Sequence, residues 1–295
     1  MHVQSNLQGV LTAPLFDDKP FTLCIGPQRT GTSWLDRYMR FRGDVCLPTG
    51  VKEVFFFDRH YAKGADFYTA KFRPKPNHKI VMEAATTAFD HAHAPSRVFE
   101  LCGPAVTLLC PLRHPVTRSY SLYRHFRRYG LVSGSLRQAV ASIPQILTTS
   151  HYAEHLTRWG DHFGLENINF VFQEDLEADP DAFLRRLCRI LHLDYIAPCR
   201  DTARPVNVST HPRPPFIAGP AQSAAEWARD RELHSVINIA KQLGLKHLLF
   251  GREDLPGLNI PIPADDLEWL SERLLPEIEK LETLLNAPIP QWRKG

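Results

Sequence analysis

Short apolar runs alternate with amphipathic stretches along the first two thirds of the chain. The apolar runs cover residues 21–26, 79–84, 105–113 and 167–176, and each is followed by residues with the apolar spacing of a helix. Runs this short and this apolar predict buried strands. Strands that alternate with helices predict a parallel sheet covered on both faces, so we expect an α/β fold.

The later part of the chain has two helical patterns separated by a proline-rich stretch. Asp179 precedes Pro180, and apolar residues recur at helical spacing over residues 183–191, which predicts a helix that begins at the proline. Residues 197–220 are rich in proline and predict an irregular loop, which could close over a site as a lid. Helical periodicity returns over residues 265–292.

Length and composition narrow the classes of protein. The 295 residues are 43% hydrophobic, and we expect one domain over residues 21–295 after an N-terminal extension of residues 1–20. The net charge of +3 and the even spread of Lys and Arg argue against a dedicated nucleic-acid binder. Six cysteines without metal-ligand spacing indicate a reducing compartment and no metal site. Without a signal peptide or membrane span in the sequence, we expect a cytoplasmic protein, whose oligomeric state stays open.

The stretch "CIGPQRTGTSWL" (24–35) joins the first predicted strand to a predicted helix. Gly26 and Gly31 have the spacing of a phosphate-binding loop, but Thr32 stands where the lysine of an ATP site belongs, and Arg29 lies inside the loop. Backbone N–H groups at such a helix start favour a phosphate or sulfate group. Three hydroxyls add donors at its edge: Thr30, Thr32 and Ser33. The alternative is a strand-to-helix turn whose glycines serve packing alone.

This loop resembles that of the sulfotransferases that use 3′-phosphoadenosine 5′-phosphosulfate (PAPS), which is written P-[KR]-[ST]-G-T-[TS]-x-L. The matching residues are Pro27, Gln28, Arg29, Thr30, Gly31, Thr32, Ser33, Trp34 and Leu35. The resemblance implies a three-layer sandwich of the P-loop nucleotide-kinase type with a central parallel sheet. It also implies that the loop binds the 5′-phosphate of PAPS, with the 3′,5′-bisphosphate PAP as product. Trp34 either stacks on the adenine or packs in the core.

A second motif lies in "LCPLRHPVTRSYSLYRHFRRYG" (109–130). Arg113 follows a predicted strand, and Ser121 stands about two turns into the next helix, on a side that can meet the arginine. The stretch is similar to the family pattern R-x-P-x-x-R-x-x-S-x-Y, in which the first arginine and the serine bind the 3′-phosphate; here these are Arg113 and Ser121. The remaining arginines of the helix are expected on a solvated basic face: Arg118, Arg124, Arg127 and Arg128.

The segment "VKEVFFFDRHYAKGADFYTAKF" (51–72) carries the candidate base. A carboxylate at Glu53, next to Lys52, could take the proton of an acceptor, although a surface Lys–Glu pair explains these two residues equally well. The segment looks like K-E-x-x-F-F-D…Y-x-K-G-x-x-W-Y of the heparan-type glycan sulfotransferases. That resemblance implies that Glu53 is the general base, that Lys52 takes part in catalysis, and that Lys52 and Asp58 orient base and acceptor.

The acceptor side departs from this pattern at two positions. Phe55 stands where many relatives have histidine, and Ala84 replaces a lysine that follows Glu83 in "MEAATTAF". We therefore expect a glycan or glycoconjugate acceptor, while a neutral sugar, a lipid or a small-molecule hydroxyl stays open. Glu83 and His60 join Asp58 as expected acceptor contacts. In the proline-rich stretch Arg213 is an expected contact of the nucleotide.

Together these patterns predict a PAPS-dependent sulfotransferase, closest in motif style to the heparan-type domain and expected to be a soluble bacterial member. It would transfer a sulfuryl group to a hydroxyl or amine without a metal, and its partner would be the acceptor glycan or small molecule. Two alternatives stay open: an ATP-dependent small-molecule kinase, which the missing loop lysine opposes, and a non-catalytic binder of nucleotide or sulfated glycan.

Overall fold

The computed structural model describes residues 15–16, 19–199 and 261–293. Within these ranges the centre of the fold is a five-stranded parallel sheet in the order β2-β3-β1-β4-β5. The strands are β1 (Phe21–Cys24), β2 (Val45–Cys46), β3 (Ile80–Ala84), β4 (Thr107–Leu112) and β5 (Ile168–Phe172). The four expected strands are confirmed, while β2 was not predicted because two residues are too few to show a period. The predicted strand over 167–176 is too long, since its last residues form a helix.

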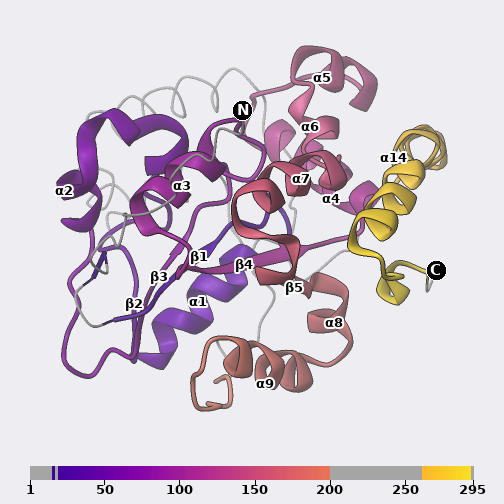
Figure 1. Cartoon of the computed structure of the whole chain (residues 1–295). Helices are drawn as coiled ribbons and strands as arrows, with labels where there is room; N and C mark the ends of the chain where they lie inside the picture. Colours follow the sequence, from indigo (N-terminus) through magenta and orange to yellow (C-terminus); the bar gives the residue numbers. More distant parts are fainter. Residues whose placement is uncertain (1–14, 17–18, 200–260, 294–295) are drawn as a thin grey trace, which may run out of the picture.

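Helices cover both faces of the sheet, as Figure 1 shows. On one face, α1 (Thr32–Arg42) and α9 (Pro180–Ile190) pack against side chains that include Cys24 of β1. On the other, α3 (Ala94–Cys102) and α7 (Tyr152–Phe163) pack around its neighbour Leu23. Successive side chains of a strand point to opposite faces, so one short apolar strand supplies both cores. The expected α/β sandwich is confirmed.

The described ranges contain further helices and helical turns. They are α2 (Gly64–Thr69), α4 (Pro115–Arg128), α5 (Leu136–Ser142), α6 (Gln145–Thr148), α8 (Gln173–Ala178) and α14 (Ala264–Leu285), with a π-helical turn at Phe56–His60 and 3-10 turns at Tyr61–Lys63, Leu165–Asn167 and Pro290–Trp292. The carboxylate of Asp179 accepts a hydrogen bond from the N–H of Ala182, so the predicted start of α9 is confirmed. α14 packs against α4 and α7.

Arg118 corrects the expected solvated face of α4. It is fully buried, and its guanidinium donates to the hydroxyls of Ser119 (3.1 Å) and Ser150 (2.5 Å) and to the carbonyl of Ile146 (2.7 Å). The amphipathic spacing of an isolated helix could not reveal this because α6 and the residues after it cover that side of α4. Arg118 joins α4 to α6, and burial lowers its pKa.

Candidate active site

The loop from Gly26 to Gly31 connects β1 to α1 at the carboxyl end of the sheet. A Cβ atom at Gly26 would lie 2.4 Å from both Cδ and the carbonyl oxygen of Pro111, so only glycine allows the loop to run this close to β4. Gly31 has φ 86° and precedes α1, and its carbonyl accepts the N–H groups of Trp34 and Leu35. The N–H groups ahead of these two residues are therefore the open donors of the first helical turn.

Arg29 links the two predicted anion motifs. Its Nε donates to Oγ of Ser121, 92 residues away, at 3.0 Å. Arg113 donates from Nε to Oγ1 of Thr117 at 3.1 Å. In the described part of the chain both guanidinium groups are hydrogen-bonded to hydroxyls, and neither forms an ion pair with a carboxylate. Positive charge without a bound acid is the electrostatic condition for holding an anion.

The pKa values of Arg29 and His125 reflect the positive charge that is concentrated around Ser121. Burial, followed by the charge of Arg113, lowers the pKa of Arg29 to about 10, which leaves the guanidinium protonated at neutral pH. Burial, followed by the charge of Arg29, lowers the pKa of His125 to about 3. His125 is four residues beyond Ser121 and shares its face of α4. It is therefore a neutral neighbour of the predicted anion motifs and cannot act as a base that titrates near pH 7.

The rest of the loop places its polar groups as follows. The hydroxyl of Thr30 donates to the carbonyl of Pro27 at 2.7 Å and closes the turn. Gln28 and Ser33 are half-buried and Thr32 is buried. The loop also contains a strained residue, since Arg29 has φ 75°, a conformation that costs a residue with a side chain roughly 1 kcal/mol or more. Strain of this kind is concentrated at ligand-binding sites.

Lys52 and Glu53 lie directly beside this loop. The Nζ of Lys52 donates to Oγ1 of Thr32 at 3.2 Å and to Oε1 of Glu53 at 3.0 Å, so one ammonium group joins the loop to the carboxylate. The other oxygen of Glu53 accepts the hydroxyl of Thr86 at 2.8 Å. The Glu53 side chain remains 12% exposed. The structure thus brings the predicted base, the predicted loop and Lys52 together, and it adds Thr86, which the sequence gave no reason to select.

The three expected acceptor contacts, Asp58, His60 and Glu83, differ in burial and in the groups they contact. Asp58 lies in the π-helical turn and is paired with Arg59 at 3.5 Å, and Arg59 stacks over the ring of Phe55 at 4.7 Å. His60 is half-buried, with its ring 5.9 Å from that of Phe67. Glu83 is fully buried beneath the segment, so its carboxylate has no surface for the acceptor contact expected from the sequence.

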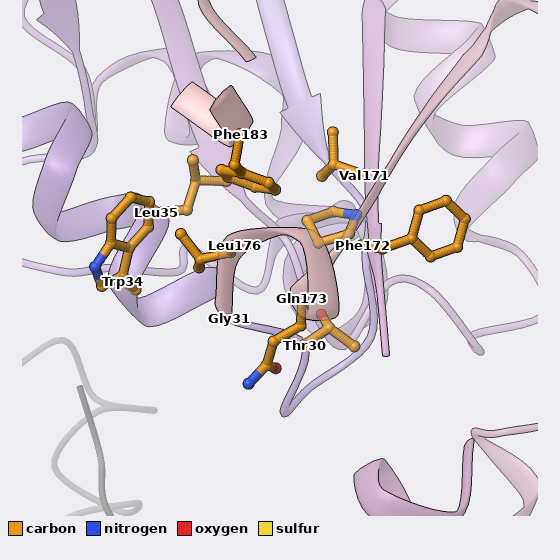
Figure 2. A pocket seen from close by; sticks show the side chains of 10 residues that line it. Thr30, Gly31, Trp34, Leu35, Val171, Phe172, Gln173, Leu176 and Phe183 are labelled. Atoms are coloured by element: carbon orange, nitrogen blue, oxygen red, sulfur yellow. The ribbon is translucent and has the colours of Figure 1, made fainter. Parts of the chain in front are cut away.

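Trp34 is part of the core between α1 and α9. Its ring lies parallel to that of Tyr38, with centroids 5.9 Å apart, and meets Phe183 edge-on at 6.2 Å. Figure 2 shows it beside Leu176 and Phe183 at a small pocket that also borders Thr30 and Gly31. No charged side chain lines this pocket, which makes it unsuitable for phosphate. These contacts favour core packing over adenine stacking for Trp34.

Three further expectations concern Arg213, a metal site and a membrane span. Arg213, and with it most of the proline-rich stretch 197–220, lies outside the described residues. Among residues 15–16, 19–199 and 261–293, no cluster of three or more metal-ligating side chains occurs. Over the same ranges no helix is both long and apolar enough to span a bilayer.

Comparison with known proteins identifies the family. The sulfotransferase domain profile matches residues 19–201, more than half of the chain, so the chain belongs to the sulfotransferase domain family. It is 28% identical over 191 residues to the bifunctional heparan sulfate N-deacetylase/N-sulfotransferase 1 of Caenorhabditis elegans, covering 59% of this chain and 22% of that protein. The bifunctional enzyme 2 of Bos taurus is 26% identical over 298 residues, which are 94% of this chain and 31% of that protein. This chain therefore spans less than a third of the length of these relatives.

A solved structure agrees on the fold. A sulfotransferase from Alicyclobacillus acidocaldarius superposes with a TM-score of 0.63 at 20% identity, over 94% of this chain and 99% of that one. The P-loop-like sandwich expected from the sequence is thereby confirmed. Membership of the family makes the chain a sulfotransferase-domain enzyme, and the family uses PAPS as its sulfuryl donor, which argues against the ATP-dependent kinase alternative. The site fits such a donor, because Arg29 and Arg113 are buried or half-buried cations without a carboxylate partner among the described residues.

Proposed function

We propose that this enzyme transfers the sulfuryl group of PAPS to a hydroxyl or amine of a carbohydrate or glycoconjugate, with Glu53 as general base. The observation that carries the proposal is the contact of Lys52 with both Thr32 and Glu53, at 3.2 and 3.0 Å. The carboxylate of Glu53 thus lies one side chain away from the segment Gly26–Ser33, which we call the phosphosulfate loop. The heparan sulfate enzymes named above support a glycan as the acceptor class.

The roles of the residues follow from charge. PAPS supplies an activated sulfuryl group, and its transfer to the acceptor atom breaks the S–O bond to the 5′-phosphate, which departs with the electron pair. Arg29 and the N–H groups at the start of α1 would stabilise the charge that develops on that phosphate. Glu53 would take the proton that the acceptor loses, and Lys52 would hold the carboxylate toward the loop. Arg113 and Ser121 would bind the 3′-phosphate.

Substituting Glu53 tests the base assignment. We expect Glu53→Gln to bind PAP with unchanged affinity, because the loop and Arg113 are intact, and to lose transfer by about 10²- to 10⁴-fold, because the amide cannot accept the proton. Calorimetry with PAP and transfer from sulfur-labelled PAPS to a panel of glycans, lipids and small alcohols measure both quantities. A glutamine variant with full turnover would remove Glu53 as the base. Transfer confined to lipids or small alcohols would remove the carbohydrate acceptor.

A further inference from the structure

A second carboxylate lies beneath the segment that carries the base. Glu83, near the end of β3, is fully buried and has both oxygens occupied. Its Oε1 accepts the backbone N–H of Val54 at 2.6 Å, and its Oε2 accepts the hydroxyl of Tyr68 at 2.5 Å. A buried carboxylate with two short hydrogen bonds fixes the groups that donate to it.

The Val54 bond acts on Glu53 directly. The N–H of Val54 and the carbonyl of Glu53 belong to one planar peptide group, so a fixed N–H fixes the plane from which the Glu53 side chain extends. Thr86, three residues after Glu83, holds the far end of the same side chain through Oε2. Residues at and just after the end of β3 thus hold both the backbone and the carboxylate of Glu53. β3 is itself anchored beside β1, where Glu83 lies opposite Leu23.

We propose that Glu83 is a positioning residue for the general base, which holds the Glu53–Val54 peptide and thereby the distance between the Glu53 carboxylate and the phosphosulfate loop. The inference rests on the proposed function of Glu53. It assigns Glu83 a role that requires burial, in contrast to the acceptor contact expected from the sequence.

The groups around Glu83 are compatible with this role on both sides of neutral pH. Burial raises its pKa to about 7, the hydrogen bonds from Tyr68 and Val54 act in the opposite direction, and the charges of Glu53 and Asp58 raise it further. Cys102 of α3 also lies near Glu83 and Tyr68, and burial raises the pKa of the Cys102 thiol. A protonated carboxyl group keeps one acceptor oxygen, so the bond from Val54 persists in either state.

Two conservative variants of Glu83 separate the length of its side chain from its charge. Glu83→Asp keeps the carboxyl group but is one methylene shorter, so we expect it to be withdrawn from the N–H of Val54, which it now meets at 2.6 Å. Glu83→Gln keeps the reach and loses the charge. For Glu83→Asp we expect kcat to fall about 10- to 100-fold, since a displaced base loses near-attack geometry, while the KM for PAPS and the Kd for PAP are unchanged. For Glu83→Gln we expect kcat to stay within about threefold of the wild type.

Tyr68→Phe is the matched control. It removes the donor to Oε2 and leaves the bond from Val54 in place, so we expect lower stability with an unchanged kcat. A merely structural role would instead reduce stability and kcat together in Glu83→Asp and Tyr68→Phe. A kcat for Tyr68→Phe as low as that of Glu83→Asp would overturn the positioning role.

Parallel measurement of Glu53→Gln keeps the two hypotheses distinct. If Glu53→Gln is inactive while Glu83→Asp retains wild-type kcat, the positioning role is wrong and the base assignment stands. If Glu53→Gln is fully active, the base assignment fails whatever Glu83→Asp does. Should Glu83→Asp not fold, amide hydrogen exchange of Val54 in the wild-type enzyme decides: slow exchange is expected, and fast exchange overturns the proposal.

Discussion

Arg29 combines backbone strain, burial and a charge that has no carboxylate partner within residues 15–16, 19–199 and 261–293. None of the three favours folding, so we expect Arg29→Ala to lower transfer by about 10²- to 10³-fold without lowering the melting temperature. Arg29→Gly should be more stable than Arg29→Ala by about 1 kcal/mol, because glycine adopts φ 75° without strain. Thermal unfolding and transfer from labelled PAPS check both statements.

The control for Arg29 is Arg185, which lies on α9 and is paired with Asp181 at 2.7 Å on the surface. Arg185→Ala should leave PAP affinity and transfer unchanged, because an exposed ion pair contributes little to stability and none of the proposed site residues lies on α9. An Arg29→Ala enzyme that keeps more than half of its transfer rate would exclude Arg29 from the site.

The contact between the loop and β4 sets the position of the proposed anion site. We expect Gly26→Ala to lower the free energy of unfolding by about 3 kcal/mol and to weaken PAP binding, because the new Cβ meets backbone that cannot turn aside. Gly43→Ala is the control, with no atom within 4 Å of its Cβ and φ 74°. It should cost about 1 kcal/mol and leave PAP binding intact. Urea unfolding and calorimetry measure the pair, and wild-type values for Gly26→Ala would contradict the close approach.

The elements also show which features a sequence can predict. The strand, loop and helix around Gly31 could be predicted because the residues that determine them are neighbours in the chain. The hydrogen bonds of Arg29 with Ser121, of Thr86 with Glu53 and of Val54 with Glu83 join residues that are 92, 33 and 29 positions apart. No local period encodes such contacts, and for this reason Thr86 was missed and Glu83 was expected on the acceptor side.

The free energy of unfolding of the whole molecule should depend on pH through the titration of Glu83. The folded protein holds the Glu83 proton up to a pKa of about 7, whereas the ordinary value is 4.5. The stabilisation from this raised pKa is fully present below pH 4.5, is lost as the pH rises to 7 and stays lost above it. Between these two limits the free energy of unfolding loses about 3 kcal/mol through Glu83.

Glu83→Gln isolates this contribution, because glutamine does not titrate and all other groups cancel in the comparison. The unfolding free energy of the wild type minus that of Glu83→Gln should therefore fall by about 3 kcal/mol between pH 4.5 and 8, as urea unfolding at both pH values would show. Glu154 supplies the opposite sign, since its hydrogen bond with Arg158 lowers its pKa. The unfolding free energy of the wild type minus that of Glu154→Gln should rise slightly over this range. If the corresponding difference for Glu83→Gln did not change with pH, the Glu83 carboxyl would titrate normally and would not be enclosed as the structure shows.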